Sequence, residues 1–279
     1  MNYNSDIILI GKNGFISRSI GHDLKQKGLN TLVLPAALDE VATALQKMKE
    51  NSWIILTQGP RRESFVNANF NQSLDRSILD LLINCTSQVI LLSSLDVYDF
   101  SLNSPWHEDG RKTVDNKYGI YKINQENYFK DVTGHSAILR LPTVWGGEFD
   151  NSSFIYKMCK DAILRGEIMV DKISNFRSLL HVTSLSRFVY SQFVNGIKLF
   201  DGTYNLCDTQ RINVLDIANI ILERTGCRML VRCFKSSRPK SMTLDNSKMV
   251  GTFGILDPIS LEFEIHKLLE RITRESSPY

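Results

Sequence analysis

The chain carries a tyrosine and a lysine, Tyr118 and Lys122, at a spacing that could support proton transfer. Residues four apart lie on one face of a helix, so the phenol and the ammonium would be neighbours. An ammonium beside a phenol favours the phenolate, which suits proton exchange with a carbonyl or hydroxyl oxygen near neutral pH. The same spacing recurs at Tyr156 and Lys160, so spacing alone does not identify a site.

Position along the chain separates the two pairs. The apolar run Val89–Leu92 ends at Ser93 and Ser94, so a serine hydroxyl at the carboxyl edge of a sheet could meet Tyr118. No such strand end precedes Tyr156. The alternative is that the serines only cap the next segment and that the first pair lies on a solvated helix face. We favour a Ser–Tyr–Lys site at the first pair.

A glycine-containing turn is expected to bind a dinucleotide. The segment Gly11–Ser17 reads G-x-x-G-x-x-S and lies between an apolar strand and an amphipathic helix. Glycines there permit a tight turn and close approach of the backbone to a pyrophosphate, while Ser17 is a small substitute at the position where helix and strand pack closely. An ordinary strand–helix turn is the alternative. The predicted cofactor contacts are Gly11, Lys12, Asn13, Gly14, Phe15 and Ile16, together with Tyr118 and Lys122.

The end of the second strand bears on the choice of cofactor. An acidic residue that binds the adenosine ribose is expected there, but Leu34 and Pro35 occupy these positions and Asp39 follows too late. Lys12 and Arg18 could instead face a 2′-phosphate. The expected cofactor is therefore NADP or NAD, with NADP preferred.

These residues need a sheet to position them, and short apolar runs alternate with helical patterns through the first half of the chain. Strands are expected at Asp6–Ile10, Thr31–Leu34, Trp53–Leu56, Val89–Leu92 and Ala137–Leu141. Helices are expected at Gly14–Lys25, Leu38–Met48, Leu74–Ile83 and Tyr118–Lys130. Fully apolar strands with helices between them indicate a doubly wound, parallel α/β sheet of Rossmann type.

The alternation loosens after Pro142, where polar, glycine-punctuated connections separate shorter elements. We expect residues 1–145 to form the dinucleotide-binding domain, joined by parts of 175–205. Residues 146–279 would form mainly a smaller substrate-binding lobe, interleaved with the first.

Composition narrows the class of protein. A chain of 279 residues, 43% hydrophobic and 23% charged, can bury a large core. Its net charge of +3 is scattered along the sequence, so nucleic acid is not an expected partner. No apolar run suits a signal peptide or membrane span, and the five cysteines include no C-x-x-C pair. We expect a cytoplasmic protein with reduced thiols, no bound metal and no membrane contact.

Several further segments, taken in order, resemble those of a known family. Three of the family-like segments are described above, namely the turn Gly11–Ser17, the strand end Ser93–Tyr98 and the pair Tyr118–Lys122. The others are Leu139–Gly146 (LRLPTVWG), Arg177–Val182 (RSLLHV), Gly202–Asn205 (GTYN), Arg238–Pro239 and Leu244–Lys248 (LDNSK). The chain resembles the extended short-chain dehydrogenase/reductases of the nucleotide-sugar epimerase/dehydratase type. The likeness runs nearly from end to end.

The resemblance implies a role for individual residues. Ser94 would be the catalytic hydroxyl, Tyr118 the acid/base, and Lys122 the residue that binds the cofactor ribose and tunes the phenol. The residues expected to bind a nucleotide-sugar substrate are Ser94, Thr143, Arg177 and Arg238. The two arginines would grip its diphosphate, with surface salt bridging as the alternative role. Two copies of the chain could form a homodimer.

Departures from the family pattern narrow the reaction. Sugar-nucleotide 4,6-dehydratases carry an Asp-Glu pair after the catalytic hydroxyl, where this chain has Leu95 and Asp96. Leucine cannot protonate a leaving hydroxide, so dehydration is disfavoured. The chain is more similar to dTDP-4-dehydrorhamnose reductase and related 4-keto-sugar reductases, although Thr143 replaces the usual asparagine.

The expected function is NAD(P)H-dependent reduction of a nucleotide-linked 4-keto-6-deoxysugar for a surface polysaccharide or similar glycan. The alternatives are a nucleotide-sugar 4-epimerase using the same three residues, and a non-catalytic dinucleotide sensor. In the loop before the catalytic tyrosine, Trp106, His107 and Glu108 could form part of the sugar pocket. His181 is expected to be a packed strand residue rather than a catalyst.

Overall fold

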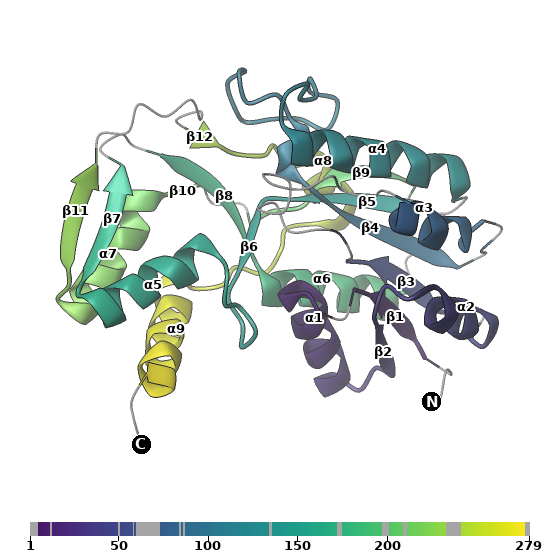
Figure 1. Ribbon diagram of the computed structural model, residues 1–279, viewed down its shortest axis with the longest axis horizontal. Coiled ribbons are helices and arrows are strands. Elements are labelled where there is room, and N and C mark those ends of the chain that lie inside the picture. The colour runs from purple at the N-terminus through teal and green to yellow at the C-terminus, as the bar shows by residue number, and fades with distance from the viewer. Residues whose placement is uncertain are drawn as a thin grey trace.

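A six-stranded parallel sheet forms the larger part of the molecule (Figure 1). The computed structural model describes residues 5–11, 13–49, 51–57, 59, 73–83, 85, 87–133, 136–171, 175–196, 201–208, 211–232 and 241–276. The strands lie in the order β2 (Thr31–Leu34), β1 (Ile7–Ile10), β3 (Trp53–Leu56), β4 (Gln88–Ser94), β5 (Ser136–Leu141) and β9 (Gly202–Asn205). Every neighbouring pair is parallel, so the carboxyl ends of all six strands meet at one edge.

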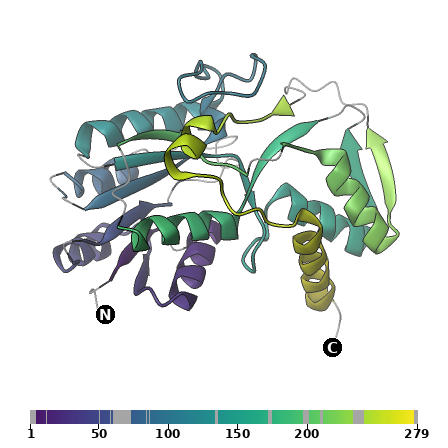
Figure 2. The same ribbon diagram turned by 180° about the vertical axis from the view of Figure 1, so that it is seen from behind.

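Helices cover both faces of this sheet (Figures 1 and 2). One face carries α1 (Phe15–Gln26), α6 (Val182–Val194) and α8 (Ser247–Phe253), and the other carries α2 (Leu38–Gln46), α3 (Ser73–Asp80) and α4 (Lys117–Val132). Strand residues alternate between the two layers because successive side chains point to opposite faces. In β1, Ile7 and Leu9 join the cluster beneath α1 and α6, whereas Ile8 and Ile10 join the cluster beneath α2, α3 and α4.

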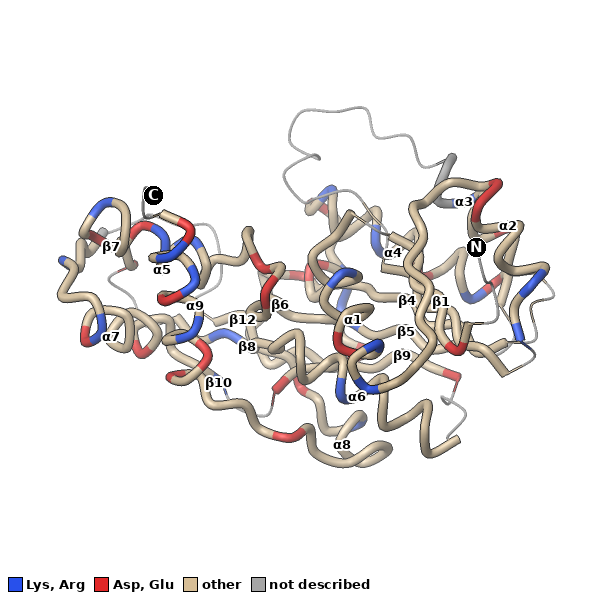
Figure 3. Tube along the Cα trace, turned by 90° about the horizontal axis from the view of Figure 1, so that it is seen from below, with Lys and Arg blue, Asp and Glu red and all other residues tan. Residues whose placement is uncertain are grey.

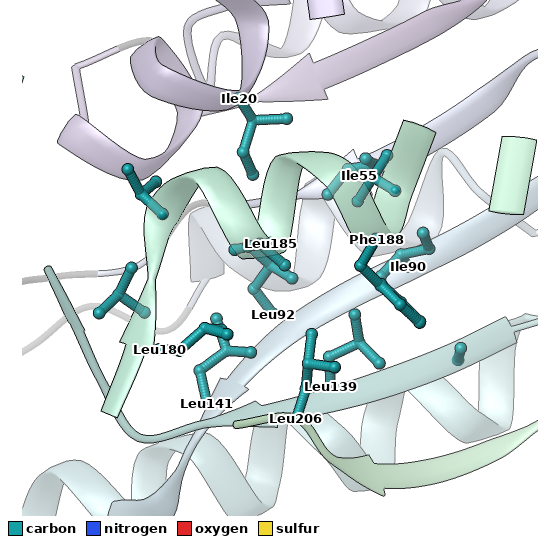
Figure 4. Close-up of a cluster of buried hydrophobic side chains, with 14 of the residues drawn as sticks. Ile20, Ile55, Ile90, Leu92, Leu139, Leu141, Leu180, Leu185, Phe188 and Leu206 are labelled. Carbon is teal, nitrogen blue, oxygen red and sulfur yellow. The ribbon is translucent and has the colours of Figure 1, made fainter. Parts of the chain in front are cut away.

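The first of these clusters shows why α1 and α6 lie together on the sheet. Figure 4 shows Ile20 of α1 and Leu185 and Phe188 of α6 pointing towards Ile90 and Leu139 of the central strands. All but Phe188, which is 4% exposed, are completely buried. Burying an apolar side chain of this size stabilises a fold by about 1.5–3 kcal/mol, so this layer is a large part of what holds the sheet and its helices together.

A smaller group of elements lies beside the sheet. It contains a sheet of β6 (Thr143–Trp145), β8 (Phe176–His181), β10 (Arg211–Asn213) and β12 (Ser241–Met242), and a parallel pair of β7 (Glu167–Asp171) and β11 (Arg228–Arg232). Its helices are α5 (Phe154–Arg165), α7 (Val214–Thr225) and α9 (Leu261–Ser276). These helices share an apolar cluster with β7 and β8. The proposed division of the chain at residue 145 stays a prediction.

The strands and helices expected in the first half of the chain are all present, and their ends differ from the expected ones by at most three residues. This confirms the doubly wound α/β fold class. Basic and acidic residues are interspersed over both parts of the molecule (Figure 3). Among the described residues, no helix has both the length and the apolar character needed to cross a membrane. The described cysteines are free thiols, and Cys233 lies outside the described residues.

Candidate active site

The order of the strands places a crevice at the ends of β1 and β3. Strand β2 lies on one side of β1, whereas β3 and the strands after it lie on the other, so the strand order reverses between β1 and β3. In doubly wound sheets, ligands bind outside the strand ends at such a reversal. Gly11 directly follows β1, with a φ of 130° that favours glycine. Gly59 lies just beyond β3, with a φ of 155°. Two backbone segments that need glycine therefore meet the crevice.

The turn after β1 is held closed by a serine. Ser17 is fully buried, and its hydroxyl contacts the carbonyl oxygens of Gly11 and, at 2.9 Å, Gly14. Close packing of helix and strand also depends on Gly21, where a Cβ would lie 2.6 Å from Cγ2 of Val33 in β2. The packing role expected of Ser17 stays a prediction. Sequence reasoning missed Gly21, although it lies inside the predicted helix.

The start of α1 suits the pyrophosphate of a dinucleotide. Gly14 has no side chain with which to cap the helix, and the first turn, described in full, carries no acidic residue. A Cβ at Gly14 would lie 3.6 Å from its nearest neighbours, so packing within the protein does not require glycine there. Backbone N–H groups of a helix start attract anions, and the exposed Asn13 and Gly14 leave them accessible. Lys12 lies outside the described residues.

Lys122 lies where two of the strands end. Its side chain is buried, and its ammonium donates hydrogen bonds to the backbone oxygen of Leu92 in β4, at 3.2 Å, and to Oε1 of Gln125, at 2.9 Å. A Cβ added to Gly59 would lie 3.3 Å from Nζ of Lys122. The ammonium therefore lies beside the ends of both β3 and β4. Tyr118, one turn earlier on α4, is half-buried and stacks on the ring of Tyr121.

The start of α4 is pressed against the end of β4. Ser94 is the last residue of β4, and the 3₁₀ turn Leu95–Val97 follows it. A Cβ at Gly119 would lie only 2.0 Å from the backbone oxygen of Asp96, so only glycine permits this approach. Because Gly119 is next to Tyr118, the contact brings the tyrosine-bearing turn to the segment that carries Ser94. Sequence reasoning missed Gly119, although it lies inside the Tyr–Lys motif.

A buried polar network supports the same strand end from behind. Glu126 of α4 accepts a hydrogen bond from Ser93 at 2.5 Å and pairs with Arg140 of β5 at 2.6 Å. Arg140 also donates to the hydroxyl of Tyr98 at 3.1 Å, and Tyr98 donates to Asn205 of β9 at 2.6 Å. Burial raises the pKa of Tyr98 to about 12, so it stays neutral. Three of the family-like segments thus meet in one structural network.

A cleft of about 470 Å³ lies on the smaller lobe and reaches the 3₁₀ turn that follows Ser94. The residues Leu95, Thr143 and Arg177 all line it, from the 3₁₀ turn, β6 and β8. The structure therefore places two of the predicted substrate-binding residues in one cleft that the residue after Ser94 also lines. Arg238 lies outside the described residues.

The second Tyr–Lys pair lies elsewhere. Tyr156 is 8% exposed and packs in the apolar cluster of the smaller lobe, with Lys160 over its ring. The loop residue Trp106 is buried too and stacks on Tyr98 and Phe100, and its place in a sugar pocket stays a prediction.

Two other polar residues near the site, Glu108 and His181, accept hydrogen bonds from backbone N–H groups. Glu108 accepts a hydrogen bond from the N–H of Asn205 at 2.8 Å. His181 is buried at the end of β8, where it caps α6 by accepting from the N–H of Thr183. These contacts agree with the packed role expected for His181.

The chain is similar to known proteins in its sequence profile and in its fold. A family profile described as the RmlD substrate binding domain matches residues 5–273. No curated protein matches the chain in sequence. Among solved structures, an NAD-dependent NDP-hexosamine 5,6-dehydratase involved in tunicamycin biosynthesis is similar, with 16% identity and a TM-score of 0.83 over 97% of this chain and 98% of that one.

Two further structures are similar over nearly their whole length. The dTDP-4-dehydrorhamnose reductase of Bacillus anthracis, in complex with NADP, is 18% identical with a TM-score of 0.76, covering 98% of this chain and 100% of that one. The UDP-glucuronic acid 4-epimerase of Bacillus cereus, in complex with UDP-glucuronic acid and NAD, is 15% identical with a TM-score of 0.80, covering 96% and 99%. At these identities the likeness shows a shared fold.

Proposed function

Because the chain belongs to the family described as the RmlD substrate binding domain, we propose that it is an NAD(P)H-dependent reductase of a nucleotide-linked 4-keto-6-deoxysugar. Its product would serve the synthesis of a surface polysaccharide or a similar glycan. The observation that carries this proposal is the place of the Lys122 ammonium, beside Gly59 and the backbone oxygen of Leu92 at the edge of the crevice.

The residues of the crevice fit a dinucleotide. The turn Gly11–Gly14 and the first N–H groups of α1 would hold its pyrophosphate, and Lys122 would hold its ribose. When bound, the reduced nicotinamide would supply the hydride for the sugar carbonyl carbon. Tyr118 would donate a proton to the carbonyl oxygen as negative charge develops there, and Ser94 would accept a hydrogen bond from a hydroxyl of the same sugar and so orient it. The ammonium of Lys122 would stabilise the phenolate that remains.

The cleft lined by Leu95, Thr143 and Arg177 would hold the nucleotide sugar. A guanidinium is suited to bidentate contact with a diphosphate, and Arg177 lines the cleft in the part that lies on β8. Arg238 is proposed as its counterpart, and Thr143 as a contact to the sugar. Leu95 lines the same cleft next to Ser94, which puts an apolar side chain where elimination of water would need an acid.

NADPH is proposed as the preferred cofactor because β2 ends at Leu34 without a carboxylate. Such a carboxylate would bind the 2′-hydroxyl of NADH and repel a 2′-phosphate. Arg18, the other basic side chain expected near that phosphate, lies over the ring of Phe149 at 4.3 Å. Fluorescence titration should show NADPH binding at least as tightly as NADH. Tenfold tighter binding of NADH would contradict the preference.

The reaction is tested by incubating the protein with NADPH and a panel of 4-keto nucleotide sugars while following the absorbance of the reduced cofactor. Stoichiometric loss of absorbance with one sugar supports a reductase. Interconversion of sugars without net cofactor consumption indicates a 4-epimerase, which would use the same three residues. Binding of cofactor with no turnover of any sugar indicates a dinucleotide sensor. The proposed homodimer can be checked by light scattering on the same sample.

A further inference from the structure

Asp96 joins the end of β4 to the start of α4 through its side chain. It is 6% exposed, and its two carboxylate oxygens face different partners. Oδ2 accepts a hydrogen bond from the hydroxyl of Ser94 at 3.1 Å, and Oδ1 accepts one from Nδ2 of Asn116 at 3.0 Å. The backbone N–H of Asp96 donates to Oγ of Ser94 at 3.2 Å. The carboxylate therefore bridges the predicted catalytic hydroxyl and the residue before α4.

The second partner is itself tied to the helix. Asn116 is the N-cap of α4, and its side-chain oxygen accepts from the N–H of Gly119 at 3.2 Å. Its amide therefore uses one end for the helix and the other for Asp96. The chain of contacts runs from Ser94 through Asp96 and Asn116 to the turn that carries Tyr118. Moving any member shifts the hydroxyl and the phenol relative to each other.

We propose that Asp96 is a positioning residue of the Ser94–Tyr118–Lys122 site, an inference that rests on the proposed function. A hydroxyl has one hydrogen and two lone pairs. In Ser94 the hydrogen is directed to the carboxylate and one lone pair accepts from the N–H of Asp96. One lone pair is left by these contacts, so Ser94 is held as a hydrogen-bond acceptor towards a sugar hydroxyl.

The contacts also distinguish this role from that of a proton acceptor. A base needs a lone pair directed at the substrate, whereas both oxygens of Asp96 already accept from donors of this chain. A positioning carboxylate needs only to accept two hydrogen bonds with the right geometry. A role in accepting a proton depends on the ionised carboxylate at this position and would be lost with an amide.

Exchanging Asp96 and Asn116 for one another distinguishes a positioning role of Asp96 from a role as proton acceptor. Asp96→Asn leaves one acceptor and one donor where two acceptors are needed, so either the contact with Asn116 fails or the contact with Ser94 reverses and frees the serine hydrogen. Asn116→Asp brings a second carboxylate against Asp96. In the Asp96→Asn/Asn116→Asp double variant, the new amide donates to the new carboxylate and its oxygen accepts from Ser94. An aspartate still caps α4, because Asp is as good an N-cap as Asn.

Each single variant should lower kcat on the order of ten- to a hundredfold, as expected for a displaced reacting group. KM and the dissociation constant for NADPH should change little, and the double variant should recover most of kcat. A double variant as slow as Asp96→Asn would overturn the proposal, because that result is expected of a proton acceptor. So would single variants as fast as the wild type.

The same four proteins should be unfolded thermally, which tests the network independently of turnover. The single variants should melt at lower temperature and the double variant near the wild type. Losses that simply add in the double variant would overturn the bridging role. If the wild-type protein reduces no sugar of the panel, the proposed function fails, while the melting cycle still decides whether Asp96 links Ser94 to α4.

Discussion

The proposed chemistry needs only the hydroxyl group of the Tyr118 side chain. Tyr118→Phe keeps the ring and its stacking on Tyr121 but removes the acid. We expect kcat to fall on the order of a hundredfold to ten-thousandfold, with NADPH affinity little changed. Steady-state kinetics combined with cofactor titration measures both. Full turnover in this variant would remove Tyr118 from the mechanism.

The chain offers a matched control at its second Tyr–Lys pair. Tyr156 has the same local spacing but packs in the core of the smaller lobe and does not line the cleft. Tyr156→Phe removes only a hydroxyl there and should leave kcat almost unchanged. If this variant were inactive while Tyr118→Phe kept full activity, the wrong pair would have been chosen.

Lys122 is expected to act on both cofactor and phenol. Lys122→Met keeps an unbranched side chain, one atom shorter, but deletes the charge and its bonds to Leu92 and Gln125. We expect kcat to fall on the order of a hundredfold and the affinity for NADPH to fall as well. The exposed lysine of the second pair gives the control, since Lys160→Met should change neither quantity. A loss of kcat with unchanged cofactor affinity would contradict the ribose-binding role.

At the scale of single residues, position along the chain was enough to predict which Tyr–Lys pair lies at the sheet edge. It did not predict that Trp106 is buried, because stacking on Tyr98 and Phe100 depends on how a loop folds back. Nor did it reveal the link from Asp96 to Asn116, which is a contact across twenty residues of sequence. Side-chain partners of this kind depend on tertiary structure that a local pattern does not encode.

Two glycines, Gly14 at the N-cap of helix α1 and Gly21 inside it, carry opposite expectations. A valine at Gly14 fits the protein, since its φ of −81° is ordinary and the nearest atoms lie 3.6 Å from the Cβ position. Gly14→Val should therefore melt near the wild-type temperature yet bind NADPH and NADH weakly, because the side chain blocks approach of the pyrophosphate. Unchanged affinity would mean that the cofactor does not use this turn.

The second glycine supplies the contrast. Gly21→Ala gains about 1 kcal/mol of helix propensity but places its Cβ 2.6 Å from Val33, and overpacking of this kind costs about 1–3 kcal/mol. We expect this variant to melt below the wild type while any protein that remains folded binds NADPH normally. A melting temperature at or above that of the wild type would show that β2 moves aside easily.

At the scale of elements, five strands of the large sheet were predictable because their runs are mainly apolar and the helices α1, α2 and α3 between them are amphipathic. The sixth strand, β9, reads GTYN and lies in a segment expected to be a polar connection, so its own sequence did not reveal it. The strands of the smaller lobe were not predictable either. Strand β8 pairs with β6, β10 and β12, which come from three distant parts of the chain, and β12 has only two residues. Such short strands exist because partners from elsewhere complete them, so their own sequences carry little signal.

At the scale of the whole molecule, the two lobes meet around His181. The ring of His181 packs edge-on against Trp145 of β6, and its Nε2 lies 3.5 Å from Glu264 of α9. The backbone N–H of His181 donates to Asp208. The nearby ring of His181 lowers the pKa of Glu264 below its usual 4.5, with help from Lys267, while burial opposes the shift. The folded protein therefore favours the charged form of this carboxylate.

A carboxylate whose pKa is lower in the folded protein contributes to stability at pH values above its ordinary pKa. This contribution is lost as the pH falls through the pKa that the group has in the folded state. Glu264→Gln should consequently lower the melting temperature near neutral pH, and the difference from the wild type should shrink below about pH 4.5. Thermal unfolding at a series of pH values measures this. A difference that stays constant from neutral to strongly acidic pH would assign the effect to packing instead of charge.

Helix α9 completes the apolar cluster of the smaller lobe with Ile265, Leu268 and Ile272, which pack against α5 and α7. Ribosomes make proteins from the N-terminal end at roughly 5–20 residues per second, so α9 emerges roughly 5–20 seconds after β7. During that interval the growing chain has an uncovered apolar groove where α9 will lie. The large sheet can bury most of its own core earlier, but the smaller lobe should depend on chaperones, or on fast synthesis, until this helix arrives.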